Sequence, residues 1–217
     1  MYINMLSDYL KDSFGEKLYR ISLDGGMTCP NRDGTCGTKG CIFCSESGSG
    51  EFTPDKFMSL ESQIEFGKSL VAKKSKSDRY IAYFQAFSNT YAPVEYLRKL
   101  YFEVINRDDI AVLSIATRPD CINDDVIELL GELNKIKPVW IELGFQTMHE
   151  HTALLINRGY LNNTFEKAIK LLQKYNLTTI VHIINGLPGE TKHDMIETVK
   201  YLNNFNINGI KIHMLHI

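Results

Sequence analysis

The stretch KLYRISLDGGMTCPNRDGTCGTKGCIFC, residues 17–44, joins a short apolar run to a loop that holds four of the chain's five cysteines. The run KLYRISL (17–23) has the β-branched and aromatic character of a buried strand. The loop has the spacing Cys29-x6-Cys36-x4-Cys41-x2-Cys44, and its glycines let the backbone wrap around a ligand. Because α/β folds place their sites at the carboxyl ends of strands, the stretch predicts a thiolate metal site after the first strand.

Five further runs of the same kind follow, separated by segments with helical spacing. They are RYIAYF (79–84), IAVLSIA (110–116), PVWIEL (138–143), TTIVHII (178–184) and GIKIHML (209–215). Strands that alternate with helices predict an α/β fold with a parallel sheet and right-handed crossovers, either a partial barrel or an open doubly wound sheet. Six strands fall short of the eight of a closed (β/α)8 barrel.

Three helix starts are marked by local sequence. Thr147 with Glu150, and Thr191 with Asp194, have the spacing of a side-chain cap that is answered three residues later by an acid. Pro93 suits the first turn of a helix.

Composition sets the organisation of the chain. With 217 residues, 44% of them apolar, the chain can bury one substantial core, so we expect one domain over residues 1–217, with an N-terminal helix within 1–16. The sequence stops directly after the sixth apolar run. An exposed apolar strand at a sheet edge invites mispairing, and we therefore expect a C-terminal segment to be missing from this chain.

Charge and hydropathy limit the function classes. The 24 Lys and Arg residues are balanced by 26 Asp and Glu residues, which leaves no overall basic field of the kind that marks a nucleic-acid binder. No basic segment followed by an apolar run opens the chain, and no stretch reaches the roughly 18 to 20 apolar residues that span a bilayer. We expect a cytoplasmic protein without a membrane partner, in which clustered cysteines hold metal rather than disulfides.

The cysteine spacing leaves two metals open. One is a structural zinc ion bound by all four cysteines of the loop. Zinc sites usually use two short C-x2–4-C pairs, however, and only Cys41 and Cys44 form one here. The other is an iron-sulfur cluster.

The ending Cys41-Ile42-Phe43-Cys44 resembles the C-x-aromatic-C signature of the radical S-adenosylmethionine (radical SAM) enzymes, whose fold is a (β/α)6 partial barrel. The long gap before it is similar to that of the elongator-like bacterial subfamily with a C-x11-C-x2-C loop. The resemblance implies that Cys29, Cys41 and Cys44 bind three irons of a [4Fe–4S] cluster, with S-adenosylmethionine on the fourth. It also implies that Cys36 is an extra cysteine that points away.

The resemblance extends over roughly residues 17–217. SIATRPD (114–120) looks like an elongator-type segment ending in ETRPD, with Ala116 in place of the acid. LGFQTMHEHTALLINRGY (143–160) resembles the fourth-strand region of elongator-like and coproporphyrinogen-dehydrogenase families, which implies cofactor contacts by Gln146 and Arg158. Physically, Arg158 could pair bidentately with the methionine carboxylate.

Further cofactor contacts follow from the same resemblance. NGLPGET (185–191) looks like the family's fifth-strand motif, with Ile184 as an apolar wall and Gly186 allowing close approach. FQAFSNTYAP (84–93) stands where many members contact the methionine amino group. Phe43 would shield the cluster from water. The polar candidates in the second-strand loop are Gln85, Asn89 and Thr90.

The remaining histidines and Cys121 have weaker signals. We expect His182 to be a polar core residue, whereas His213 and His216 would flank the open end of the barrel and could meet a substrate. Cys121 reads as a small buried residue.

Two functional classes remain. The first is a radical SAM enzyme that forms a 5′-deoxyadenosyl radical and abstracts hydrogen from its substrate, with an electron donor such as flavodoxin or ferredoxin. The resemblance implies modification of the wobble-uridine side chain in tRNA, with a tetrapyrrole or another small metabolite as the alternative substrate. The second class is a non-catalytic binding module stapled by zinc. The strand-end motifs favour the enzyme.

Overall fold

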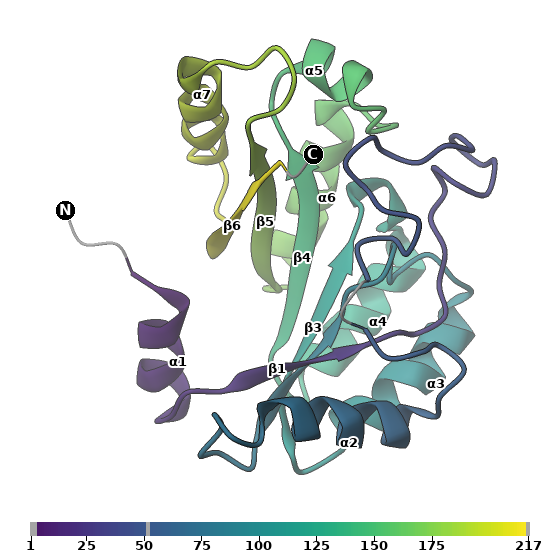
Figure 1. Cartoon of the computed structure of the whole chain (residues 1–217), viewed down its shortest axis with the longest axis vertical. Coiled ribbons are helices and arrows are strands. Elements are labelled where there is room, and N and C mark those ends of the chain that lie inside the picture. Colours follow the sequence, from purple (N-terminus) through teal and green to yellow (C-terminus); the bar gives the residue numbers. More distant parts are fainter. Residues whose placement is uncertain (1–3, 51–52, 216–217) are drawn as a thin grey trace.

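A computed structural model of the chain describes residues 4–50 and 53–215. Six parallel strands form one sheet in which every strand pairs with its sequence neighbours, in the order β1 to β6. The sheet curls into a half-barrel, so the predicted partial barrel is confirmed and the open doubly wound sheet is excluded (Figure 1). The strands are β1 (Tyr19–Leu23), β2 (Tyr80–Phe84), β3 (Ile110–Thr117), β4 (Val139–Gln146), β5 (Thr178–Asn185) and β6 (Gly209–Met214).

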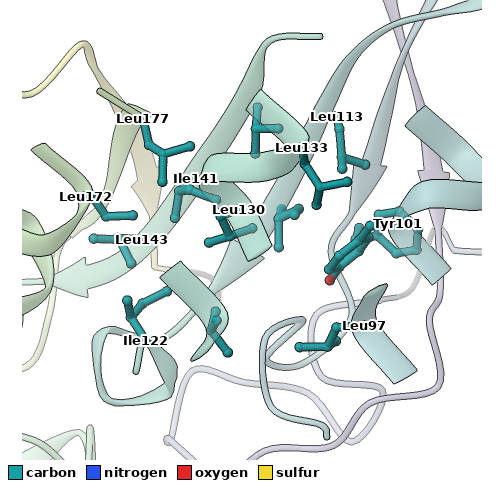
Figure 2. Close-up of a cluster of buried hydrophobic side chains, with 14 of the residues drawn as sticks. Leu97, Tyr101, Leu113, Ile122, Leu130, Leu133, Ile141, Leu143, Leu172 and Leu177 are labelled. Carbon is teal, nitrogen blue, oxygen red and sulfur yellow. The ribbon is translucent and has the colours of Figure 1, made fainter. Parts of the chain in front are cut away.

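Helices connect the strands and cover the outer face of the sheet (Figure 1). A large apolar cluster fills the layer between this face and the helices, and Figure 2 shows part of it, from Leu97 and Tyr101 to Leu172 and Leu177. The helices are α1 (Leu6–Phe14), α2 (Leu60–Val71), α3 (Val94–Ile105), the 3-10 turn η1 (Pro119–Cys121), α4 (Asp124–Asn134), α5 (Glu150–Leu155), α6 (Asn162–Lys174) and α7 (Lys192–Leu202).

Two of the three predicted helix starts hold in the structure. Thr191 and Asp194 form a complete capping box at the start of α7. Pro93 occupies the N-cap position of α3, one residue before the first turn.

The third predicted helix start is wrong. Strand β4 continues to Gln146, three residues beyond its predicted end, and α5 begins only at Glu150 without a side-chain cap. The hydroxyl of Thr147 instead donates to Glu190 at 2.5 Å, and the carboxylate of Glu150 accepts from the backbone of Asn162 at 2.7 Å. Both side chains serve tertiary contacts, which local spacing does not reveal.

A second, smaller apolar cluster closes the bottom of the barrel. Leu10 of α1 and Leu18, just before β1, pack with Ile81, Val112 and Trp140, and all five are buried. Side chains two residues apart on a strand share a face. The residues two positions further along these strands therefore point into the barrel one layer higher.

The last strand has an exposed outer face. Ile210, Ile212 and Met214 are exposed there, while Lys211 and His213 alternate with them and face inward. Within residues 4–50 and 53–215, no helix is long and apolar enough to cross a bilayer. His216 lies outside the described residues, so its predicted position at the open end stays a prediction.

Candidate active site

A cavity of about 780 Å³ opens inside the barrel at the carboxyl ends of the strands. Its wall combines the cysteine loop with residues from the strand ends and from the inner face of the sheet. The long connection between β1 and α2, which carries the cysteines, runs on the same side of the molecule as α5 (Figure 1). Sequence position and structure thus agree on where the site lies.

The cysteine loop is fastened to the segment that follows α5. The backbone N–H of Ile42 donates to the carbonyl of Ile156 at 3.1 Å. Two asparagine side chains cross-link the same segments: Asn31 donates to the carbonyl of Asn157 at 2.6 Å, and Asn157 donates to the carbonyl of Gly40 at 2.6 Å. These bonds fix the loop from both sides and so set the positions of its thiols.

Three of the four loop thiols reach the cavity. Cys29, Cys41 and Cys44 line it, as predicted, whereas Cys36 is exposed, does not line it and places its sulfur 4.0 Å from a carboxylate oxygen of Asp120. Burial raises the pKa of Cys41 to about 11, although the Asn31 amide donates to its sulfur at 3.5 Å. Metal binding would require this thiol to lose its proton, because the thiolate is the form that ligates a metal.

The donor set has the chemistry of an iron-sulfur site. Three soft thiolates around one cavity are the donors that iron-sulfur clusters use. Among the residues that the structure describes, no group of three or more His, Cys, Asp or Glu side chains is arranged to hold one metal ion. Because Cys36 lies apart from the other three, the four-cysteine zinc arrangement is not formed.

Arg118 is a residue of this site that the sequence prediction missed. Its guanidinium pairs with both carboxylate oxygens of Asp120 at 2.9 and 2.7 Å and donates to the carbonyl of Arg158 at 2.9 Å. It lines the cavity, and its charge lowers the pKa of Cys41 against the opposing effect of burial. The signal was present in SIATRPD, where an arginine and an aspartate follow the third strand directly.

Gln146 lines the cavity with a strained backbone. Its φ of 73° is in the left-handed region, which a residue with a side chain rarely adopts. Its side-chain oxygen is buried without a hydrogen-bond partner among the described residues. Strain and an unsatisfied acceptor together point to a ligand contact.

Arg158 also reaches the cavity wall, but its guanidinium is engaged within the protein. Only 1% of the residue is exposed, and it donates to the carbonyls of Phe145, Thr147 and Tyr160 and to the side chain of Asn162, at 2.7 to 3.1 Å. Here it holds the end of β4 in place. A bidentate pairing with a carboxylate would require some of these bonds to be given up.

The other predicted cofactor contacts divide into two groups. Phe43, Gln85 and Ile184 line the cavity. Asn89 and Thr90 do not line it, because their side chains are buried. Asn89 donates to the carbonyl of Ala116 at 2.9 Å, and Thr90 donates to the carbonyl of Cys121 at 2.7 Å. These bonds hold the loop after β2 against the end of β3.

Gly186 also lies off the cavity wall, in the turn after β5. Its φ of 86° is a conformation that glycine adopts readily, so the turn itself explains why a glycine stands at this position. Cys121 is buried, as expected for a small packing residue.

A set of polar side chains lies inside the barrel, one from each strand, and the sequence analysis had identified one of them, His182, as a polar core residue. We call it the polar ring. Its centre is the carboxylate of Glu142, which accepts from Ser114 at 2.7 Å and from His182 at 2.6 Å and pairs with Arg20 at 2.9 Å and Lys211 at 3.3 Å. The ring consists of Arg20, Tyr83, Ser114, Glu142, His182 and Lys211.

Burial and neighbouring charges shift the pKa values of the ring residues. Burial alone would raise the pKa of Glu142, but the hydrogen bond from His182 and the charges of Arg20 and Lys211 hold it well below its usual range. Burial lowers the pKa of His182, and it lowers that of His213, which His182 contacts at 3.4 Å, to about 4. Burial also lowers the pKa of Lys211, so the ring favours a charged Glu142 carboxylate beside Arg20 and disfavours extra positive charge on Lys211 and His182.

Family comparison agrees with this geometry. Residues 33–202 match the model of the radical SAM superfamily. The chain belongs to the radical SAM superfamily. Its cofactors are accordingly a [4Fe–4S] cluster and S-adenosylmethionine, and the cavity offers three thiols and an unsatisfied polar site for them.

Relatives of this radical SAM chain support the assignment. It is 48% identical to the uncharacterized protein YtqA of Bacillus subtilis (strain 168) over 98% of its own length and 66% of that protein. Among solved structures, Methanocaldococcus infernus Elp3 superimposes with a TM-score of 0.64 at 17% identity, covering 91% of this chain and 45% of Elp3. Escherichia coli coproporphyrinogen III oxidase (HemN) superimposes at 0.62 with 14% identity, covering 98% and 48%. The two superpositions show a shared fold.

Proposed function

We propose that this protein is a radical SAM enzyme that abstracts hydrogen from a substrate bound in the barrel cavity. The observation that carries the proposal is the arrangement of Cys29, Cys41 and Cys44 on one cavity wall while Cys36 lies outside it. When bound and reduced, the cluster supplies an electron that cleaves S-adenosylmethionine to a 5′-deoxyadenosyl radical. The protein contributes position and electrostatics to this chemistry.

The residues of this chain have distinct roles in the proposal. Cys29, Cys41 and Cys44 hold the cluster, and the positive charge of Arg118 favours the thiolate form of Cys41. Gln146 presents its unsatisfied amide oxygen to the cofactor. Phe43 and Ile184 give the cavity an apolar wall that keeps water away from the reacting atoms.

We propose tRNA, at the wobble uridine, as the substrate. The support is the resemblance of SIATRPD and of the fourth-strand segment to elongator-like enzymes, together with the fold shared with Elp3. With a net charge of −2 the chain has no overall basic field, so RNA binding would depend on local basic patches. A small metabolite is the second candidate, because the cavity is enclosed by side chains on the inner face of the sheet and the fold is shared with HemN.

The remaining expectations follow from the cofactor. A low-potential cluster needs a reducing protein, for which flavodoxin or ferredoxin has the right chemistry, and a compartment that keeps free thiols reduced, which is the cytoplasm.

The test is anaerobic reconstitution with iron and sulfide, followed by reduction in the presence of S-adenosylmethionine and an assay for 5′-deoxyadenosine. Cys41→Ala should lose the cluster absorption and the product, while the matched variant Cys36→Ala keeps both. Stoichiometric zinc without iron-sulfur absorption or cleavage would instead identify a zinc-stapled module. Stimulation of 5′-deoxyadenosine release by unmodified tRNA, and not by tetrapyrroles, would support the tRNA substrate; the reverse would favour the small metabolite.

A further inference from the structure

The polar ring carries more positive charge than its own carboxylate neutralises. Arg20 and Lys211 share the single carboxylate of Glu142, at 2.9 and 3.3 Å. Burial lowers the pKa of Lys211 and of both histidines beside it, and a bound anion would favour their protonated forms. The phenol of Tyr83 is neutral, since burial raises its pKa. Two cations therefore share one carboxylate at this level of the barrel, and of the two Lys211 is the one that lines the cavity. A buried charge without a counterion is costly, so this wall favours an anion.

The hydrogen bonds of the ring leave a donor available. The carboxylate of Glu142 has four partners, and the Nε of Arg20, which has none among the described residues, is buried away from the cavity lining. Among the described residues, the ammonium of Lys211 makes two hydrogen bonds, both long at 3.3 Å, to Glu142 and Tyr83. Lys211 also lines the cavity, so its third N–H can reach a ligand there.

The ring is distinct from the thiol loop. Arg20, His182 and Lys211 each lie three residues before the end of their strand, whereas the cysteines are on the loop beyond the strand ends. At about 3.3 Å per residue, these three residues lie about 10 Å below the ends of their strands. An anion bound there would be deeper in the barrel than groups held at the thiols.

We infer that the cavity wall formed by Lys211, His213 and the polar ring binds an anionic group of the substrate, a carboxylate or a phosphate. Lys211 contacts the anion, and His213 flanks it on the same strand. Glu142 and His182 are positioning residues, because they hold Lys211 and His213 without needing to touch the ligand. The inference rests on the proposed function only for the identity of the molecule that carries the anion.

The ligand probes are acetate and inorganic phosphate, titrated at constant ionic strength into the protein without cluster or S-adenosylmethionine. Calorimetry measures their affinity, with Lys211→Met as the test variant. Lys200→Met is the matched control, because Lys200 is an exposed lysine on α7 that pairs with Glu197. Loss of a charged hydrogen bond predicts roughly tenfold weaker binding for Lys211→Met, with the affinity of Lys200→Met unchanged.

A second measurement uses the unmodified protein, so its result does not depend on whether a variant folds. In the unmodified protein, the imidazole NMR signals of His182 and His213 should shift on anion addition, while that of His193, which is exposed on α7, serves as the internal reference. Preference for acetate would identify a carboxylate ligand, and preference for phosphate a phosphate ester.

Three results would overturn the inference: neither anion binds, both lysine variants weaken binding equally, or the signals of His182 and His213 move no more than that of His193. Competition by S-adenosylmethionine in the reconstituted protein would also overturn it, because the wall would then belong to the cofactor. The titrations use protein without cofactors, so the two proposals can be tested separately. Absence of anion binding together with 5′-deoxyadenosine formation would refute the anion site alone. Anion binding without 5′-deoxyadenosine formation would refute the proposed enzyme activity alone.

Discussion

Replacing Glu142 by Gln should destabilise the protein strongly, although the two side chains have almost the same shape. The Glu142 side chain is fully buried and neutralises Arg20 and Lys211 at 2.9 and 3.3 Å. The substitution leaves both cations in the barrel without a counterion, and removal of one member of a buried ion pair costs about 3 to 5 kcal/mol. For a chain of this size, each kcal/mol lowers the melting temperature by about 2 to 4 °C, so a decrease of about 6 to 20 °C is expected.

The control is Glu132→Gln, which makes the same chemical change at an exposed pair with Arg98. Exposed pairs contribute about 0 to 1 kcal/mol, so this variant should unfold close to the wild type. Urea unfolding followed by circular dichroism measures both. Adding Lys211→Met to Glu142→Gln should recover part of the loss, since one unpaired cation is then removed. If Glu142→Gln costs no more than Glu132→Gln, or if the double variant recovers nothing, the electrostatic account of the ring is wrong.

Further outcomes can be checked with the same preparations. Thr191→Ala should lower the free energy of unfolding by about 1 kcal/mol in urea titrations, because it removes the capping box of α7. Gln146→Gly relieves a left-handed φ and should leave stability unchanged or raise it, while S-adenosylmethionine binding measured by calorimetry weakens; unchanged binding would remove Gln146 from the site. Arg118→Met should slow alkylation of Cys41 by iodoacetamide, followed by mass spectrometry, since it removes a charge that favours the thiolate. Burial, with smaller contributions from His182 and Lys211, lowers the pKa of His213 from 6.5 to about 4. As the pH drops, His213 therefore takes up its proton in the unfolded chain before it does so in the folded protein. The free energy of unfolding should consequently fall between about pH 6.5 and about pH 4. Because His213 is half-buried, this loss should be about 1 to 2 kcal/mol, and urea midpoints of His213→Gln should vary less over that range.

The strands could be predicted from the sequence because each is a near-continuous apolar run. Five of the six predicted strand ends lie within one residue of the observed end, and the fourth strand is the exception. Its last three residues, Gly144 to Gln146, include a glycine and a left-handed glutamine, which look like a turn locally but pair with β5. Tertiary pairing decided the boundary, and only the folded sheet reveals it.

The site was predictable where its residues are close in sequence. The cysteine loop could be assigned because its four thiols lie within sixteen residues, Cys29 to Cys44. Asn89 and Thr90 were predicted as ligand contacts because they are polar residues on a strand-end loop, and whether such a side chain turns toward the cavity or toward a buried carbonyl depends on the neighbouring strand.

The polar ring could not be predicted from the sequence, for a different reason. Its members are spread from residue 20 to residue 211, and no local spacing connects them. The available signal was a charged residue inside an otherwise apolar run, as with Glu142 in VWIEL and Lys211 in GIKIHM. A charge in such a position needs a partner inside the barrel, and its identity follows only from which strands face one another.

The polar ring also bears on how the chain finds its native strand pairing. Each strand contributes one member of the ring, and a slip of one residue would turn that side chain to the outer, apolar face. A sheet that assembled with β4 out of register would bury Glu142 among the helices and leave Arg20 and Lys211 without it. Apolar strands alone tolerate such slips, because valine and isoleucine pack on either face. The ring therefore favours the native strand register during folding, because a barrel with a strand out of register would bury a charge without its partner.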